Sequence, residues 1–160
     1  MVVLRNWQKQ IINDFPAIVK QHRRFILKAP TGAGKTILAS EIVEQFYKGK
    51  KILVLCHRLV LLEQLQKALS VRHSVHKLSV SEDGKAFDGY DILLSTNMRA
   101  KDVLEEAIKM ADLIIVDEAH RVSPNGTGYK KIIDDFENEG KIGAQFMGLT
   151  ASPERRTGDQ

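Results

Sequence analysis

The chain has 160 residues, of which 43% are hydrophobic and 28% are charged, a balance that is ordinary for a single globular domain with a sizeable core. Its longest apolar runs have about five residues, against the roughly 20 that a membrane-spanning helix needs, and the start MVVLRNWQKQ lacks the apolar stretch of a secretory signal. A single cysteine, Cys56, excludes an internal disulfide framework and fits a reducing compartment, so we expect a cytoplasmic protein without a membrane partner.

Charge is unevenly distributed along the chain, whose formal net charge is +4. Basic residues predominate between positions 20 and 72, and residues 102–139 lean acidic. A basic region can attract a polyanion, and it can equally be a solvated surface, so charge alone leaves both interpretations open. The basic residues of the first region are Lys20, Arg23, Arg24, Lys28, Lys35, Lys48, Lys50, Lys51, Arg58, Lys67 and Arg72.

Periodic apolar residues predict an amphipathic helix over residues 5–20, in which Pro16 favours a kink. A short strand at 25–27 then runs into a loop at 29–34. A helix with one apolar face follows, and Gly49 is a suitable stop signal for it. That apolar face is formed by Ala39, Ile42, Val43 and Phe46.

In the middle of the chain, a continuous apolar strand is predicted at 52–56 and is followed by a helix. A strand at 75–80, a loop at 81–89 and a second apolar strand at 91–95 come next. The helix is marked by Leu61, Leu62, Leu65 and Leu69.

The last third predicts a helix, a strand at 113–116, a loop at 123–128, a second helix and a final strand at 145–149. The first of these helices is marked by Val103, Leu104, Ala107 and Ile108. The second is marked by Tyr129, Ile132, Ile133 and Phe136.

Short apolar strands thus alternate with amphipathic helices, which predicts one α/β domain over residues 1–160 with a mainly parallel sheet covered on both faces. In such sheets, ligands bind at the carboxyl ends of the strands. Every unusual motif of the sequence falls at a predicted strand end, so we expect the functional site at that edge of the sheet. These motifs lie at 29–36, 56–58, 95–96, 117–120 and 150–152.

The segment APTGAGKT, residues 29–36, lies between a predicted strand and a predicted helix, as a phosphate-binding loop does. Its glycines permit backbone conformations in which N–H groups wrap around phosphate oxygens at a helix N-terminus. Lys35 would then contact the β- and γ-phosphates and Thr36 would ligate Mg²⁺. Ala29 stands where the strict pattern has a glycine, and the alternative is a glycine-rich turn without a ligand. We expect the nucleotide to be held by Pro30, Thr31, Gly32, Ala33, Gly34, Lys35 and Thr36.

The stretch LIIVDEAH, residues 113–120, drives an apolar strand into two adjacent carboxylates and a histidine. Asp117 at the end of the strand is placed to hold Mg²⁺. Glu118 is placed to polarise an attacking water, which favours hydrolysis of the γ-phosphate over its transfer to a small molecule. The alternative for both acids is an ordinary charge pair at the start of a helix.

His120 is the least specific residue of this stretch, since a lone histidine is usually structural. Here it would link the nucleotide site by hydrogen bonds to the end of the last strand. The residues it would reach there are Thr150 and Ser152.

Together, these segments resemble the motifs of the superfamily 2 DEAD/DEAH-box helicases and translocases, in that family's order and spacing and across almost the whole chain. The residues of LCHRLVLLEQ and DEAH are most similar to those of the branch that contains type III restriction-subunit-like proteins and DNA repair or recombination helicases. The resemblance implies the first RecA-like domain of such a protein, a P-loop NTPase three-layer sandwich with ATP and Mg²⁺ as cofactors. The segments are LRNWQ (4–8), APTGAGKT (29–36), LCHRLVLLEQ (55–64), LLSTNMR (93–99), DEAH (117–120) and LTASP (149–153).

The resemblance also implies roles for residues outside the phosphate loop and the DEAH stretch. Gln8 would read the adenine edge, and Arg5 would pack near the base. Arg58 and Thr96 would hold the phosphate backbone of one nucleic-acid strand through sequence-independent, salt-sensitive contacts. The alternatives for these two are a surface arginine and a strand-capping threonine.

We therefore expect an ATP-dependent nucleic-acid motor domain that hydrolyses ATP when a second RecA-like domain completes its site. DNA is favoured over RNA as its partner, although contacts to the phosphate backbone do not distinguish the two. That second domain is absent from the sequence, so we expect the N-terminal part of a longer protein that begins natively at Met1. By itself, it would be a monomer with weak activity or none. Two alternatives are a P-loop kinase or small nucleotide-binding switch, for which no lid segment is visible, and a module that binds ATP or a partner protein without turnover.

Overall fold

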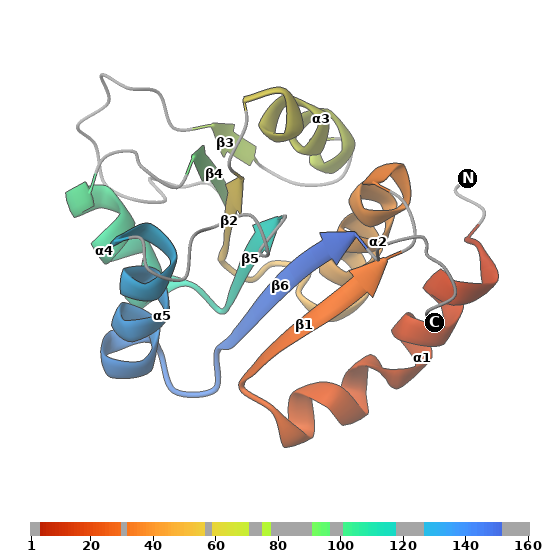
Figure 1. Cartoon of the computed structure of the whole chain (residues 1–160), viewed down its shortest axis with the longest axis horizontal. Helices are drawn as coiled ribbons and strands as arrows, with labels where there is room; N and C mark the ends of the chain where they lie inside the picture. The colour runs from red at the N-terminus through yellow and green to blue at the C-terminus, as the bar shows by residue number, and fades with distance from the viewer. Residues whose placement is uncertain are drawn as a thin grey trace.

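The computed structural model of the protein describes residues 4–29, 32–56, 59–70, 75–77, 91–96, 101–117 and 127–151 (Figure 1). The strands are β1 (Arg24–Ala29), β2 (Ile52–Cys56), β3 (Val75–Lys77), β4 (Ile92–Thr96), β5 (Leu113–Asp117) and β6 (Gln145–Ala151). The helices are α1 (Asn6–Gln21), α2 (Gly32–Phe46), α3 (Leu59–Leu69), α4 (Lys101–Met110) and α5 (Thr127–Glu139). Within these ranges, no helix has the length and apolar character needed to cross a membrane.

The strands form one sheet in the order β1-β6-β5-β2-β4-β3, and all neighbouring strands in it are parallel. Because parallel strands point the same way, their carboxyl ends meet at one edge of the sheet. That carboxyl edge carries Ala29, Cys56, Thr96, Asp117 and Ala151. It is the edge that the sequence motifs mark.

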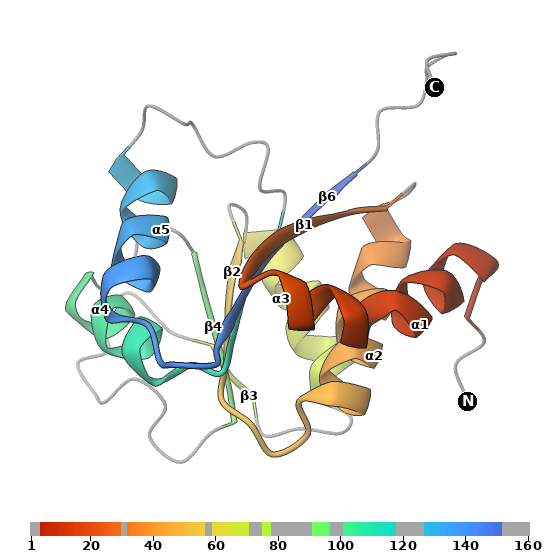
Figure 2. The same cartoon turned by 90° about the horizontal axis from the view of Figure 1, so that it is seen from below.

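Helices cover both faces of the sheet, with α1, α2 and α3 on one side and α4 and α5 on the other (Figure 2). The fully buried strand β2 shows why both faces need a cover, since its side chains alternate between two apolar cores. Ile52, Val54 and Cys56 join the core under α1, α2 and α3. Leu53 and Leu55 join the core under α4 and α5. The predicted α/β sandwich with a parallel sheet is therefore confirmed.

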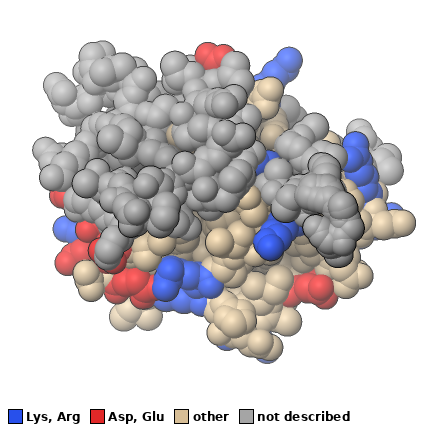
Figure 3. Space-filling model, viewed as in Figure 1, with Lys and Arg blue, Asp and Glu red and all other residues tan. Residues whose placement is uncertain are grey.

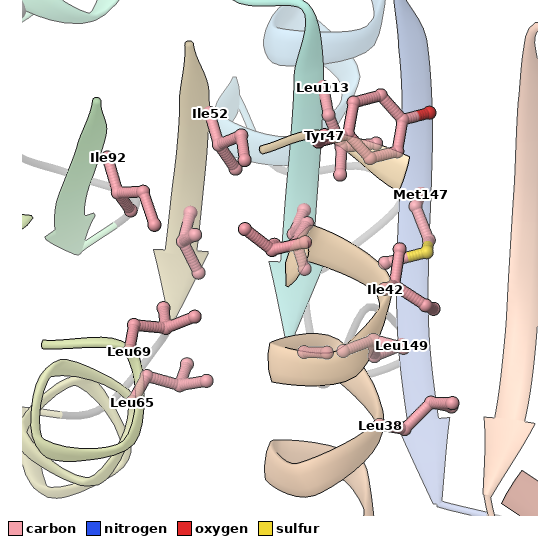
Figure 4. Close-up of a cluster of buried hydrophobic side chains, with 14 of the residues drawn as sticks. Leu38, Ile42, Tyr47, Ile52, Leu65, Leu69, Ile92, Leu113, Met147 and Leu149 are labelled. Atoms are coloured by element: carbon pink, nitrogen blue, oxygen red, sulfur yellow. The ribbon is translucent and has the colours of Figure 1, made fainter. Parts of the chain in front are cut away.

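The first core is the larger of the two, and Figure 4 shows how its helices meet the sheet. Leu38 and Ile42 project from α2, and Leu65 and Leu69 project from α3, toward side chains of the strands (Figure 4). Full burial of such a side chain contributes about 1.5–3 kcal/mol to folding. This packing fixes the position of α2, whose first turn carries the predicted phosphate-binding residues.

Phe15 anchors α1 to the same layer. Its ring is 1% exposed, stacks on Phe46 with centroids 4.9 Å apart, and meets Phe25 edge-on at 5.8 Å. The helix runs from Asn6 through the exposed Pro16 to Gln21. Burial of the neighbouring aromatic ring offsets the cost of the backbone hydrogen bond that a proline cannot make.

Two predicted loops are shorter than the sequence suggested. Helix α2 begins at Gly32, so the last three residues of the predicted loop at 29–34 belong to the helix. Helix α5 begins at Thr127, inside the predicted loop at 123–128. Strand β1 extends to Ala29 because it stays in register with β6 up to Ala151. Of the predicted strand at 75–80, the part beyond Lys77 lies outside the described residues.

The opposite, amino-terminal edge of the sheet is held together around Asp112, which directly precedes β5. The Asp112 carboxylate accepts hydrogen bonds from the Lys51 N–H at 2.9 Å and from the Lys141 ammonium at 2.8 Å. Partial burial raises the pKa of Asp112, but these two donors outweigh it and hold the pKa below its ordinary value. Tyr47 donates its hydroxyl to Gln145 Oε1 at 2.6 Å, and burial, with the nearby Asp112 charge, raises the pKa of Tyr47.

Candidate nucleotide-binding site

Lys35 and Asp117 form a buried ion pair at the carboxyl edge of the sheet. Lys35 lies in the first turn of α2, and Asp117 is the last residue of β5. In the sheet, strand β6 lies between β5 and β1, the strand that precedes α2. Lys35 Nζ is 3.1 Å from Asp117 Oδ1, and the two side chains are 3% and 7% exposed. The fold therefore brings together the lysine and the aspartate that the sequence assigns to one site.

The chemistry of this pair fits a magnesium–phosphate ligand. Asp117 Oδ1 makes no directed hydrogen bond within the described ranges, so its contact with the ammonium is held by charge. A carboxylate oxygen with free lone pairs suits a hard cation such as Mg²⁺, which prefers oxygen ligands. The Lys35 ammonium in turn suits phosphate oxygens. Because burial of unpaired charge is costly, each group needs either the other or such a ligand.

The remaining phosphate-loop residues are described in part. Gly32 and Ala33 are helical positions of the first turn of α2, and Thr36 lies on the same helix with a partly exposed side chain. Pro30 and Thr31 lie outside the described residues.

The glycines of the phosphate loop have the backbone conformation of a helix. Gly32 and Gly34 are helical, and the glycines with positive φ in the described ranges are Gly49 and Gly143. The reason is that α2 begins earlier than the sequence suggested, so both residues adopt the dihedral angles of a helix.

Gln8 connects the upstream segment to the phosphate loop. Its side chain is 1% exposed, its amide Nε2 donates to the Gly34 carbonyl at 3.1 Å, and its Oε1 accepts from the Arg5 N–H at 2.7 Å. The side chain of Arg5 is exposed at the start of α1. The resemblance implies a position near the nucleotide for Gln8, but no spacing in the sequence indicates the bond to Gly34.

Besides Pro30 and Thr31, four predicted site residues lie outside the described part of the chain, namely Arg58, Glu118, His120 and Ser152. Thr96 ends β4 in register with Cys56 of β2, and its side chain is also outside the described set. Thr150 is buried on β6, in register with Lys28 of β1. The predicted nucleic-acid contacts and the predicted link from His120 to the last strand therefore stay predictions.

Several basic residues of the first half of the chain are paired with carboxylates away from the carboxyl edge. Arg23 and Arg24, at the start of β1, both contact Glu137 of α5, and Lys48 pairs with Glu44. On the face drawn in Figure 3, acidic and basic side chains are interleaved. For these residues, the structure favours the solvated-surface interpretation of the local charge excess over a polyanion-binding patch.

A hollow of about 260 Å³ lies between α4 and α5 and is lined by Glu105, Lys109, Asp135 and Glu139. None of the predicted site residues that the structure describes is among those four. The hollow is therefore separate from the Lys35–Asp117 site.

Comparison with known proteins places the chain in a family. It matches the family model described as "Type III restriction enzyme, res subunit" over residues 1–155. It is 31% identical over 162 residues to the Type I restriction enzyme EcoAI endonuclease subunit of Escherichia coli, which covers 93% of this chain and 19% of that protein.

Solved structures share the fold. The Sulfolobus solfataricus SWI2/SNF2 ATPase core in complex with dsDNA matches with a TM-score of 0.68 at 21% identity, over 95% of this chain and 32% of that one. The UvsW helicase from bacteriophage T4 matches with a TM-score of 0.63 at 19% identity, over 93% of this chain and 52% of that one. The chain thus spans about half or less of the length of each relative.

These likenesses confirm the RecA-like α/β fold that the motifs implied. The family model covers nearly the whole chain, including every motif of the predicted site. The chain belongs to the Type III restriction enzyme, res subunit family, as a RecA-like domain of the superfamily 2 helicase and translocase class.

Proposed function

We propose that the chain is the ATP-binding motor domain of a nucleic-acid helicase or translocase. The observation that carries the proposal is the buried Lys35–Asp117 pair, which lies where the phosphate-loop helix meets the end of the DEAH strand. Family membership supports a motor over a kinase or a small nucleotide switch. A module that binds ATP without turnover describes the behaviour we expect of the isolated chain.

In this proposal, Lys35 and Asp117 exchange partners when nucleotide binds. The Lys35 ammonium moves from the carboxylate to the β- and γ-phosphate oxygens, with help from residues 30–34 and the backbone N–H groups at the start of α2. Asp117 and the Thr36 hydroxyl would hold Mg²⁺, which would neutralise charge on the phosphates. Neither buried charge is left alone in either state, so the exchange avoids the cost of an orphaned ion.

Hydrolysis itself is assigned to Glu118. Its carboxylate orients a water in line with the γ-phosphate and accepts a proton as the water oxygen bonds to phosphorus and the bond to the bridging oxygen breaks. The products are ADP and phosphate. We assign His120, Thr150 and Ser152 to the coupling of this step with movement, and Arg5 with Gln8 to recognition of the adenine base.

Nucleic acid is the proposed partner at the same edge of the sheet. Arg58 lies two residues after the end of β2, Thr96 ends β4, and β2 and β4 are neighbours, so the carboxyl ends of the two strands lie side by side. Contacts from these residues to phosphates would hold one strand irrespective of its sequence. DNA is favoured over RNA because the SWI2/SNF2 relative is a complex with dsDNA.

A second RecA-like domain is the other proposed partner. Each relative extends well beyond the part that this chain matches. Such a domain would close the open side of the nucleotide site and supply arginines to the developing charge, a contribution of about 10³- to 10⁵-fold in related NTPases. The 160-residue chain should therefore bind ATP·Mg²⁺ weakly and hydrolyse it slowly.

The proposal is tested by ATP hydrolysis assays with and without DNA and RNA. The chain alone should turn over slowly and without stimulation, whereas a longer protein that contains it should be stimulated by DNA. Glu118→Gln in the longer protein should abolish the stimulated rate and leave ATP binding intact. Rapid DNA-stimulated turnover by these 160 residues, or a stimulated rate that survives Glu118→Gln, would contradict the proposal.

A further inference from the structure

We infer that Gln8 is a positioning residue for the phosphate loop, in addition to its proposed role in reading adenine. The inference rests on the proposed function, since it gives a second task to a residue of the same site. Its basis is a side chain that is 1% exposed and whose amide is bonded to backbone at both ends. Nε2 donates to the Gly34 carbonyl at 3.1 Å, and Oε1 accepts from the Arg5 N–H at 2.7 Å.

These two partners fix which way the Gln8 amide points. The Arg5 N–H can only donate, and the Gly34 carbonyl can only accept. A flipped amide would set an NH₂ group against the N–H and an oxygen against the carbonyl, so both bonds would be lost. The side chain is therefore a directed link between the start of α1 and the first turn of α2.

The position of Gly34 makes this link relevant to phosphate binding. Its carbonyl belongs to the planar peptide group that joins Gly34 to Lys35, so the bond from Gln8 fixes the backbone from which the lysine side chain projects. The ammonium at the end of that side chain lies 3.1 Å from Asp117 Oδ1. A continuous set of contacts therefore runs from Gln8 through Gly34 and Lys35 to the end of β5.

Helix α1 is held in place by contacts that do not involve Gln8. Further along the helix, Phe15 is 1% exposed, stacks on Phe46 and meets Tyr47 edge-on at 6.1 Å. Because these contacts hold α1 independently of Gln8, loss of the amide should loosen the first turn of α2, where the peptide before Lys35 lies, rather than release the whole of α1. Phosphate affinity should fall even for a ligand that has no base.

The experiment measures the affinity of three ligands in the presence of Mg²⁺ by calorimetric titration: ATP, GTP and inorganic tripolyphosphate. The 160-residue chain is compared with Gln8→Ala and with Gln10→Ala. Gln10 is a matched control, because it is a glutamine on the same helix whose exposed amide donates to the Asp14 carboxylate. All titrations are run at a temperature where circular dichroism shows every variant folded.

We expect Gln8→Ala to weaken all three ligands by a similar factor of about 3- to 10-fold, the effect of one buried hydrogen bond. Gln10→Ala should change none of them. If Gln8 only reads the base, its replacement will weaken ATP and leave tripolyphosphate unchanged, which would overturn the inference alone. If the unmodified chain binds none of the three ligands, the proposed function fails and the inference fails with it.

A second pair of variants separates positioning of the loop from support of the helix start. Arg5 has φ −76°, an angle that a proline can adopt. Arg5→Pro therefore removes the N–H that donates a hydrogen bond to Gln8 Oε1, and it leaves the bond from Gln8 to Gly34 in place. Arg5→Ala removes the same charge and keeps the N–H. Equal tripolyphosphate affinity in the two variants is the expected result. A further loss in Arg5→Pro as large as that in Gln8→Ala would show that Gln8 acts through the helix start, and the inference would be wrong.

Discussion

Lys35 Nζ lies 3.1 Å from Asp117 Oδ1, and both side chains are almost fully buried. The pair joins the first turn of α2 to the end of β5, across the intervening strand β6. Two opposite charges held in this way stabilise each other only as long as both are present, because without Lys35 the carboxylate oxygen Oδ1 of Asp117 would be buried with neither a hydrogen bond from the described residues nor its ion-pair partner. This relationship makes the site testable through stability as well as through binding.

Removing one member of the pair should destabilise the fold. We expect Lys35→Met to lower the free energy of unfolding by about 3–5 kcal/mol, because it leaves the Asp117 carboxylate buried without its partner. The double variant Lys35→Met with Asp117→Val should recover most of that loss, since it removes both charges. Urea unfolding of the two single variants and the double variant measures this coupling.

Lys48→Met is the control for that cycle. Lys48 pairs with Glu44 on the surface, with its side chain 71% exposed, and such pairs contribute about 0–1 kcal/mol. If Lys35→Met costs no more than Lys48→Met, the Lys35–Asp117 pair does not hold the site together.

Removal of Mg²⁺ should weaken ATP binding through Asp117. We expect ATP with Mg²⁺ to raise the melting temperature of the unmodified chain, since a ligand at 100 times its Kd adds about 2.7 kcal/mol of stability. Chelation with EDTA should reduce the rise. In Asp117→Asn, whose amide is a poorer ligand for Mg²⁺, EDTA should change the melting temperature by much less. An equal effect of EDTA on both chains would remove Asp117 from the metal site.

Acid should weaken the amino-terminal edge of the sheet through Asp112. Burial raises the pKa of this carboxyl, but the Lys141 ammonium and the Lys51 N–H outweigh it and set the pKa below the ordinary 3.8. The folded state thus keeps Asp112 charged where the unfolded chain already binds a proton, so its contribution is full above about pH 4 and is lost as pH falls through the lowered pKa. The free energies of unfolding of the unmodified chain and of Asp112→Asn should therefore become similar as the pH falls below about 4.

The same series in a Lys141→Met background serves as the control for Asp112. Without the ammonium, the difference between Asp and Asn at neutral pH should shrink, because the largest stabilising partner of the charge is gone. A difference that persists unchanged down to pH 3 would contradict the assignment.

Gly140→Ala should destabilise the end of α5. A Cβ at this position would lie 2.4 Å from the Phe136 carbonyl oxygen and 2.8 Å from its ring carbon Cδ1, and that ring is fully buried beneath the Arg23 guanidinium. We expect a loss of about 1–3 kcal/mol, typical of overpacking. Gly49→Ala is the comparison, since it meets open space and is strained only by its φ of +77°. Unfolding of Gly140→Ala at the same urea midpoint as the unmodified chain would refute the clash.

The elements of the fold could be predicted because their signals are local. The run at 52–56 is apolar on both faces, as a central parallel strand must be, and the spacing of Ala39, Ile42 and Val43 matches a helix packed on one side. The order of strands could not be predicted in the same way. No local pattern places β5 and β6 between β1 and β2, because that order depends on how the crossover helices pack.

The candidate site shows the same division. The motifs predicted that Lys35 and Asp117 share a site, since both follow strands of one parallel sheet. They did not predict that Gln8 bonds to Gly34 or that α2 begins at Gly32, because both depend on contacts between residues far apart in the chain. The charge excess of the first half left two interpretations open for a related reason, since Arg23 and Arg24 find their partner, Glu137, near the other end of the chain.

Calorimetric titration of the 160-residue chain with ATP and Mg²⁺ tests the central claim most directly, when it is repeated with Lys35→Ala and Lys48→Ala variants that circular dichroism shows to be folded. The site described here predicts saturable binding with one ATP per chain, kept in Lys48→Ala and lost in Lys35→Ala. Absence of saturable binding by the unmodified chain, or an affinity that Lys35→Ala leaves unchanged, would contradict it.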